Sequence, residues 1–231
     1  MLKIDIVSVQ PGMFGGFLSE SMVARAVRKG ACRINIVDLR DFAHDKRRTV
    51  DDRPYGGGPG MLMTCPPWFE AVESLTGEAA GSPRPGQRVV MTSPGGRRFT
   101  QRDAELLSEC EHLVFMCGHY EGFDSRIGML ATDRFSIGDF VMTGGELAAA
   151  AMVDSVVRLL PGVLGGGPAA TADESFGRAG LLEAPQYTHP VVFRGLKVPD
   201  VLLSGDHRRI DAWRKSEARR VTMEMRPDLL P

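Results

Sequence analysis

The chain lacks any long hydrophobic run. None of its 231 residues fall in a stretch of about 18 consecutive apolar residues, the length that a membrane-spanning helix requires. Its start, Met1-Leu2-Lys3-Ile4-Asp5, also lacks the charged and then apolar segments of a signal peptide. We therefore expect a cytoplasmic protein with no membrane partner.

The chain also has few cysteines and almost no net charge. The four cysteines have no metal-ligand spacing and lie among apolar neighbours, which favours buried, reduced thiols. Lys and Arg number 28 against 29 Asp and Glu, so the whole chain carries no polybasic signal for nucleic acid, and we expect no DNA partner. The 43% hydrophobic and 25% charged content is ordinary for a globular protein and excludes disordered, collagen-like and disulfide-scaffold classes.

Several catalytic motifs are also missing. The chain contains no Gly-Lys step, which excludes a P-loop kinase or ATPase. No G-x-G-x-x-G follows the first apolar run, which argues against a Rossmann dinucleotide site. Neither H-E-x-x-H nor G-x-S-x-G occurs, and the five histidines are scattered, so metal and serine hydrolases have no support.

Short β-branched apolar runs alternate with helical patterns through the first two thirds of the chain. The runs predict strands at 4–9, 33–37, 88–92 and 112–117. The helical patterns cover 17–29, 66–75, 100–109 and 146–160. Near-continuous apolar strands separated by helices indicate an α/β fold with a mainly parallel sheet covered on both faces.

A change in composition divides the chain. Residues 161–172 (PGVLGGGPAATA) predict a flexible linker between a domain at 1–160 and a small basic helical domain at 173–231. Residues 191–231 contain nine Lys/Arg and six Asp/Glu, a net charge of +3. Basic residues recur in pairs around Trp213: Arg208, Arg209, Arg214, Lys215, Arg219 and Arg220. They form either a solvated helix face or a surface that contacts phosphates.

Three glycine-rich loops each adjoin a predicted strand. They read DDRPYGGGPGM (51–61), MCGHYEG (116–122) and SIGDFVMTGGE (136–146). Glycines let a backbone approach a flat ligand and leave its N–H and C=O groups unhindered. Any one loop is more simply explained as a tight turn at a strand end, but three in one sheet domain favour a shared ligand site.

In this order, the three loops resemble the bacterial tRNA (guanine-37-N1)-methyltransferases of the SPOUT class. Other matching segments are SVQPGMF, VVRLLPGVLG, ESF, LLEAPQYTHP, LLSGDHRRIDAWR and MRPDLL, and the resemblance runs from residue 2 to 230. It implies a SPOUT-type α/β fold with a deep trefoil knot, a homodimer, and a helical C-terminal domain that binds tRNA. The implied reaction transfers a methyl group from S-adenosylmethionine to N1 of guanosine 37, and the sequence leaves open whether Mg²⁺ assists.

The resemblance also implies binding residues. For the cofactor these are Thr92, Ser93, Pro94, Gly95, Gly118, Tyr120, Glu121, Gly122, Ile137, Gly138, Asp139, Phe140, Val141, Met142, Gly144 and Gly145. For the target nucleotide they are Asp51 and Arg53, with Pro59 and Gly60 in the same loop.

The reaction requires a base, because guanine N1 carries a proton at neutral pH. By resemblance Glu174 is that base and Arg158 faces the guanine O6, although Asp173 is an alternative base. Without the resemblance, the two acids would be first-turn helix residues and Arg158 a helix-end cation.

Two other functions stay open: another SPOUT RNA methyltransferase and a non-catalytic RNA-binding protein. The first glycine loop and the acid before Ser175-Phe176 favour guanine N1 over a ribose hydroxyl. The presence of Arg158 and both acids argues against a protein that has lost catalysis.

Overall fold

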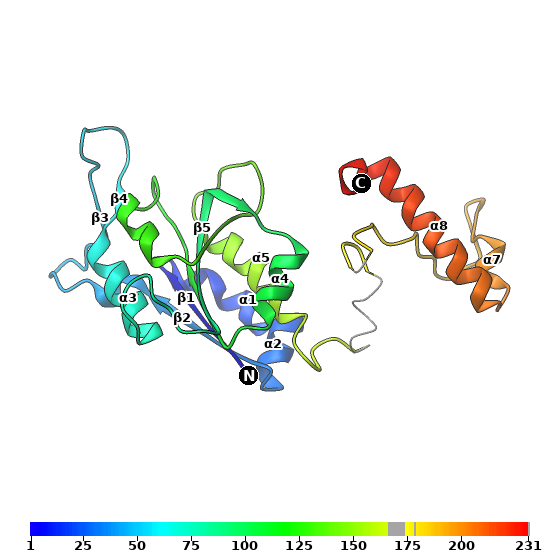
Figure 1. The fold of residues 1–231 in the computed structure, drawn as a ribbon, viewed down its shortest axis with the longest axis horizontal. Coiled ribbons are helices and arrows are strands. Elements are labelled where there is room, and N and C mark those ends of the chain that lie inside the picture. The colour runs from blue at the N-terminus through cyan, green and yellow to red at the C-terminus, as the bar shows by residue number, and fades with distance from the viewer. Residues whose placement is uncertain (166–173, 178, 231) are drawn as a thin grey trace. The chain divides into compact units, whose positions relative to one another are not determined.

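The computed structural model describes residues 1–165, 174–177 and 179–230 (Figure 1). Contacts divide the chain into two compact units, Met1–Gly165 and Gly166–Pro231, and each unit is described by itself. Residues 166–172 of the expected linker, and Asp173, lie outside the described residues.

A five-stranded sheet forms the centre of the first unit. Its order is β2-β1-β6-β5-β7, and all neighbouring strands are parallel. The strands are β1 (Leu2–Ser8), β2 (Cys32–Asp38), β5 (Gln87–Arg98), β6 (His112–Met116) and β7 (Asp133–Ser136). Every residue of β6 is buried, which explains its continuous apolar sequence, because a covered parallel sheet has no solvent face. The predicted mainly parallel α/β architecture is confirmed.

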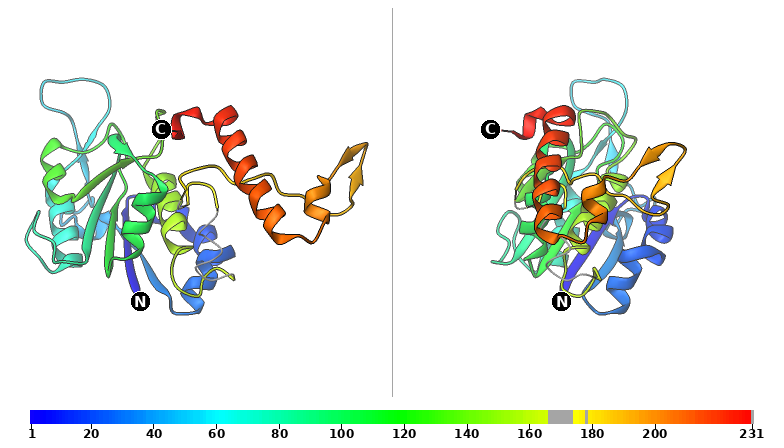
Figure 2. Two further views of the ribbon diagram at one scale, coloured as in Figure 1. Left: turned by 45° about the vertical axis from the view of Figure 1, so that its right-hand side comes forward. Right: turned by 90° about the vertical axis from the view of Figure 1, so that its right-hand side faces the viewer.

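Helices cover both faces of this sheet (Figure 2). One core cluster joins the sheet to residues of α1 (Gly15–Ser19), α2 (Ser21–Arg28), α4 (Gln101–Ser108) and α5 (Glu146–Val157). The other cluster joins it to α3 (Cys65–Thr76) and to the 3-10 helices η2 (Leu39–Phe42) and η3 (Ser125–Leu130). Trp68 of α3 is fully buried in that second cluster. The sheet therefore packs against its helices through two separate hydrophobic cores.

Two predicted helices differ from the structure. The single helix expected at 17–29 is two helices, because Glu20 is extended (φ −122°, ψ 164°) and Ser21 has a φ of 56°. A 3-10 helix, η1 (Pro11–Phe14), precedes them. The helix expected at 146–160 ends at Val157, and Arg158 is its C-cap.

Strand β5 is interrupted by a bulge that leaves the sheet. Phe135 of β7 pairs with both Thr92 and Arg97, so residues 93–96 are extra. A side chain at Gly96 would place its Cβ 2.6 Å from the backbone nitrogen of Phe135, so only glycine fits there. The bulge carries Ser93, Pro94 and Gly95 away from the paired residues on either side of it.

A hairpin carries the first glycine loop. Its strands are β3 (Asp51–Asp52) and β4 (Leu62–Met63), with Asp51 paired to Met63. Gly56, Gly57 and Gly58 have φ values of 85°, 78° and 129°, a conformation that other residues rarely adopt.

The buried side chain of Asp5 in β1 is surrounded by hydrogen-bond donors. Its carboxylate lies 2.7 Å from His112 Nε2 and 2.9 Å from Lys3 Nζ, and it accepts a 3.1 Å bond from Asn35 Nδ2. Burial acts to raise the pKa of Asp5, but these hydrogen bonds outweigh it and hold the pKa below its ordinary value. Asp5 is therefore a satisfied carboxylate in the interior.

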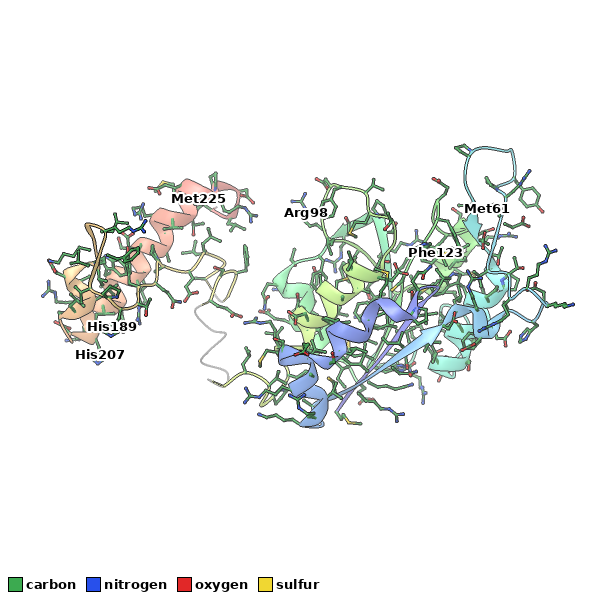
Figure 3. All side chains as sticks on the ribbon, turned by 180° about the vertical axis from the view of Figure 1, so that it is seen from behind. Met61, Arg98, Phe123, His189, His207 and Met225 are labelled. Carbon is green, nitrogen blue, oxygen red and sulfur yellow. The ribbon has the colours of Figure 1, made fainter. Side chains whose placement is uncertain are left out.

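The second unit contains β8 (Val192–Phe193), β9 (Leu196–Lys197), α7 (Asp200–Leu203), α8 (His207–Met225) and the 3-10 helix η4 (Pro227–Leu229). Figure 3 labels His207 and Met225 at the two ends of α8. Asp206 caps α8 by accepting a 3.2 Å bond from the Arg209 N–H. The buried Thr222 hydroxyl accepts a 2.9 Å bond from the Leu182 N–H, which fastens the chain after Glu174 to α8.

Among the described residues, no helix is both long and apolar enough to cross a membrane.

Candidate active site

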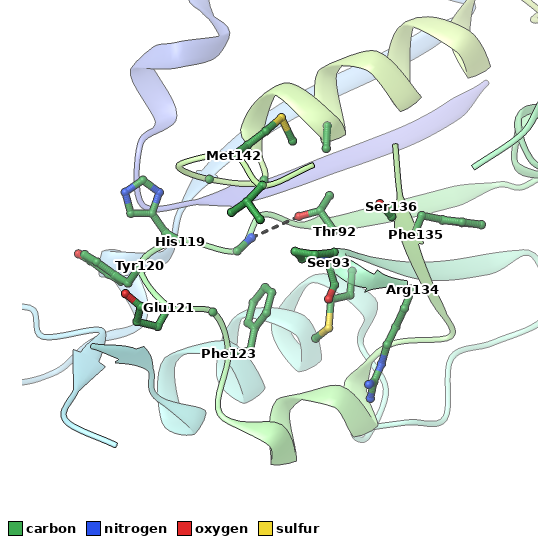
Figure 4. Close-up of a pocket in the computed structure, with 18 of the residues that line it drawn as sticks. Thr92, Ser93, His119, Tyr120, Glu121, Phe123, Arg134, Phe135, Ser136 and Met142 are labelled. Carbon is green, nitrogen blue, oxygen red and sulfur yellow. Dashed lines mark hydrogen bonds between the residues drawn. The ribbon is translucent and has the colours of Figure 1, made fainter. Parts of the chain in front are cut away.

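A pocket of about 410 Å³ lies where the carboxyl ends of β5, β6 and β7 meet (Figure 4). In open parallel sheets this edge is the usual ligand position, because the loops that leave the strands converge there. Its walls come from three segments: the end of β5 with its bulge, the loop after β6, and the loop between β7 and α5.

The loop after β6 is fixed to β5 by a threonine. The Thr92 hydroxyl donates a 3.0 Å hydrogen bond to the Met116 carbonyl. It also accepts a 3.3 Å bond from the Gly118 N–H, which is the dashed line in Figure 4. A Cβ at Gly118 would lie 2.8 Å from Cε2 of Phe123, which also lines the pocket. The Gly118 backbone is therefore held close to its neighbours.

The loop before α5 is joined to the same place. The Gly145 N–H donates a 2.7 Å bond to the Gly118 carbonyl, and Gly144 forms a β-bridge with His119. A Cβ at Gly145 would collide with Thr92 Oγ1 and would lie 2.8 Å from the Gly118 nitrogen. Three chain segments thus meet at a point that admits no side chain.

Tyr120 forms one rim of the pocket in a conformation unusual for a non-glycine residue. Its φ is 58°, and its ring lies edge-on to that of His119 with 4.9 Å between the centroids. The Arg40 guanidinium donates a 3.3 Å bond to the Tyr120 hydroxyl. These contacts hold the strained backbone.

The first glycine loop adjoins the second. The Glu121 N–H donates 3.0 Å to the Met61 carbonyl, and the Met63 N–H donates 2.9 Å to the Gly122 carbonyl. A Cβ at Gly60 would collide with the Glu121 side chain. Figure 3 labels Met61 and Phe123 on these adjoining segments. The structure therefore places the loop expected to hold the nucleotide beside the wall expected to hold the cofactor.

The structure gathers most of the expected cofactor residues around one cavity. All of them line the pocket except Gly95, which lies in the β5 bulge, and Asp139. The Asp139 carboxylate is exposed and pairs with Arg98 at 2.9 Å. Asp51 is half-buried, and Arg53, Pro59 and Gly60 are exposed on the hairpin loop.

Neither of the two expected catalytic residues lines this pocket. The Arg158 N–H bonds to the Asp154 carbonyl at the far end of α5. Twelve residues separate it from Glu146, about 18 Å along a helix. Glu174 belongs to the second unit, where it lines a different cavity of about 800 Å³ beside α8. Asp173 is outside the described residues.

Sequence reasoning did not assign several residues of this pocket. Among them are His119, Phe123, Arg134, Phe135, Ser136 and Thr143. The rule that ligands bind beyond the carboxyl ends of strands would have indicated those at the end of β7. No local pattern marks Phe123, because its place depends on how the loop after β6 folds back.

A buried acid beneath the pocket was also missed. Glu146 is 2% exposed at the first turn of α5, and its Oε1 accepts a 2.7 Å bond from the Ser8 hydroxyl. The sequence shows it only as the last letter of a glycine-rich loop.

The part of the chain that the structure describes contains no candidate metal site. There, no group of three or more His, Cys, Asp or Glu side chains could hold an ion. The pocket instead offers closely approachable backbone beside aromatic and aliphatic side chains, a surface suited to a flat organic ligand.

Known proteins match nearly the whole chain. Residues 2–231 match the family described as tRNA (Guanine-1)-methyltransferase TrmD. A tRNA (guanine-N(1)-)-methyltransferase of Geobacillus kaustophilus (strain HTA426) is 56% identical over 230 residues, covering 99% of this chain and 91% of that protein. The protein of the same description from Bacillus cereus (strain AH820) is 54% identical, covering 99% of this chain and 92% of that protein. The chain belongs to the tRNA (Guanine-1)-methyltransferase TrmD family.

Proposed function

We propose that this chain transfers a methyl group from S-adenosylmethionine to N1 of guanosine 37 in tRNA. Family membership and the names of its relatives support methylation of guanine N1 in tRNA. The observation that carries the proposal further is the pocket, in which the end of β5, the loop after β6 and the loop before α5 meet at Gly118 and Gly145 with no room for a side chain.

The pocket suits a cofactor of this size and shape. Its volume of about 410 Å³ lies within the range of small-molecule sites. Thr92, Gly118 and Gly145 would hold the ligand close to the backbone, with Phe140 and Met142 supplying apolar contact. When bound, S-adenosylmethionine supplies a methyl group already activated on a sulfonium. A divalent cation is not required for that activation.

Glu174 and Arg158 carry the remaining chemistry in this proposal. The Glu174 carboxylate takes the proton from guanine N1, and the freed electron pair of N1 forms the new bond to the methyl carbon as the carbon–sulfur bond breaks. The Arg158 guanidinium faces O6, where negative charge develops as the proton leaves. The hairpin loop with Asp51, Arg53, Pro59 and Gly60 holds the nucleotide.

We further infer a homodimer. Arg158 lies ten residues beyond Ala148, the last residue of α5 that lines the pocket, which is about 15 Å along the helix. A second copy is therefore the simpler source of the guanidinium that serves that pocket. The deep trefoil knot of the SPOUT class belongs to the same proposal. It rests on membership of the family.

The second unit binds the tRNA in this proposal. Its exposed helix α8 carries Lys and Arg on a chain segment of net charge +3, which suits phosphate contacts.

The product of one reaction tests the function. Incubation with S-adenosylmethionine and undermodified tRNA should yield N1-methylguanosine at position 37. A 2′-O-methylated nucleoside would instead identify another SPOUT RNA methyltransferase. If folded, cofactor-bound protein gives no methylated product, the function that remains is that of a non-catalytic RNA-binding protein.

The base is tested by a matched pair of amides. Glu174→Gln should leave cofactor binding intact and lower single-turnover methyl transfer by roughly 10²-fold, the usual effect of losing a general base. Asp173→Asn is the control. If Glu174→Gln keeps the wild-type rate while Asp173→Asn is inactive, the base is Asp173, and if neither is slower, the general-base assignment is wrong.

A further inference from the structure

The carboxylate of Glu146 lies buried where the pocket loops meet α5. Its side chain is 1% exposed, and Oε1 accepts a hydrogen bond from Ser8, whose own oxygen accepts a 2.8 Å bond from the Gln10 N–H. A buried carboxylate needs several donors. The second oxygen, Oε2, faces the loop after β6.

His119 of that loop places a buried nitrogen opposite this oxygen. Its Nδ1 has no hydrogen-bond partner among the described residues, and it lies 3.8 Å from Glu146 Oε2, just beyond hydrogen-bond range. A buried ring nitrogen without a partner is rare and costly in a folded protein. The tyrosine ring beside His119 offers only an edge contact.

Gly144 leaves the path between the two groups open. A Cβ at Gly144 would lie 2.7 Å from His119 Nδ1 and would collide with Glu146 Oε2. The backbones of residues 144 and 119 are already joined by a β-bridge. A small closing movement of the loops would therefore bring the nitrogen and the carboxylate together.

We propose that His119 and Glu146 are positioning residues for the cofactor: when it occupies the pocket, the His119 Nδ1–H donates to the Glu146 carboxylate and locks the loop after β6 against the start of α5. The inference rests on the proposed function. Neither side chain takes part in methyl transfer. Closure by about 1 Å would bring the 3.8 Å separation of Nδ1 and Oε2 into hydrogen-bond range.

Asparagine and glutamine distinguish the two ring nitrogens. The amide nitrogen of asparagine can occupy the place of Nδ1, whereas that of glutamine occupies the place of Nε2. His119→Asn should therefore bind S-adenosylmethionine with nearly wild-type Kd in calorimetry. His119→Gln and His119→Ala should bind about tenfold more weakly, the effect of losing one hydrogen bond to a charged group.

A double variant tests the partner. Glu146→Gln should also weaken binding, and adding His119→Ala to it should cause much less than a further tenfold loss, because both changes remove the same contact. The KM for tRNA should stay unchanged throughout, and thermal unfolding without cofactor should show that each variant is folded.

The outcomes separate this inference from the proposed function. Wild-type affinity in His119→Ala, or equal weakening in His119→Asn and His119→Gln, overturns the role of Nδ1 while cofactor binding stands. If the loss of affinity in the double variant equals the product of the two single losses, His119 and Glu146 act independently and the pairing is wrong. If the wild-type protein binds no S-adenosylmethionine, the proposed function itself is wrong.

Discussion

Gly145 is a backbone position in the pocket with no room for a side chain. Because a Cβ there would collide with Thr92 Oγ1, Gly145→Val should push the loop before α5 away from Gly118 and abolish S-adenosylmethionine binding. Calorimetry measures the loss. Gly12→Ala is the matched control, because nothing lies within 4 Å of its added methyl group. Near-normal affinity in folded Gly145→Val would contradict the assignment of the pocket.

The buried carboxylate of Asp5 makes a different prediction, for stability against pH. Its pKa is lowered in the folded protein, so its contribution is full above the unfolded value near 3.9 and is lost as the pH falls through the folded pKa. Asp5→Asn should lower the free energy of unfolding at pH 7 by about 1–3 kcal/mol. The difference from wild type should shrink as the pH falls below about 4.

Denaturant unfolding of the first unit measures this effect. Asp139→Asn serves as control, since that carboxylate is 88% exposed and its pair with Arg98 should contribute little. An Asp5→Asn deficit that stays constant down to pH 2 would show that size and packing, rather than charge, explain it.

The cations of α8 are unequal, although the sequence shows them as a uniform series. Arg220 is bound by both Glu217 and Glu224, at 2.7 and 2.8 Å, and these carboxylates raise the pKa of its guanidinium. Lys215 and Arg219 have no ion pair within the part of the chain that the structure describes. They are therefore the better candidates for phosphate contacts.

This difference predicts the salt dependence of tRNA binding. Lys215→Ala and Arg219→Ala should each weaken binding and lower the salt slope by about one unit, because one phosphate contact is lost. Arg220→Ala should leave the slope unchanged, because its charge is already balanced. An unchanged salt slope in all three variants would show that this face of α8 contacts solvent and not tRNA.

The separation of Arg158 from its own pocket gives a prediction for the assembled enzyme. A mixture of Arg158→Ala and Gly145→Val chains should regain about a quarter of wild-type activity, since half of the dimers are hybrids with one intact site. Methyl transfer is measured after the two proteins are unfolded and refolded together. Activity no greater than the sum of the separate variants would show that each pocket uses the Arg158 of its own chain.

The alternation of apolar strands and helices predicted the parallel sheet, because burial gives β1, β2, β5 and β6 a largely apolar sequence. The edge strand β7 (DRFS) was not predicted, because only its last two residues are buried. Three further features left no such signal. The break at Glu20 depends on one backbone conformation, and the β5 bulge on the fit of Gly96 against Phe135. The burial of Glu146 depends on Ser8, more than a hundred positions away in the chain.

The candidate site could be predicted to a similar extent. The family resemblance named most of the residues that line the pocket, and the glycine-rich loops pointed to the same segments. Which nitrogen of His119 faces an acid, and which cation of α8 is already paired, are properties of contacts between side chains. These contacts are seen only in the three-dimensional structure.

The strand order has a consequence for how the chain acquires its structure during synthesis. Strand β1 pairs with β2, which begins only about 30 residues after it, and with β6, which begins about 110 residues after it. Pairings between distant segments form more slowly than those between near ones. A growing chain that has passed β2 therefore carries an open sheet edge until residues 112–116 leave the ribosome. The pocket is complete only when Gly145 has followed, so a nascent chain cannot bind its cofactor before nearly all of the first unit has been made.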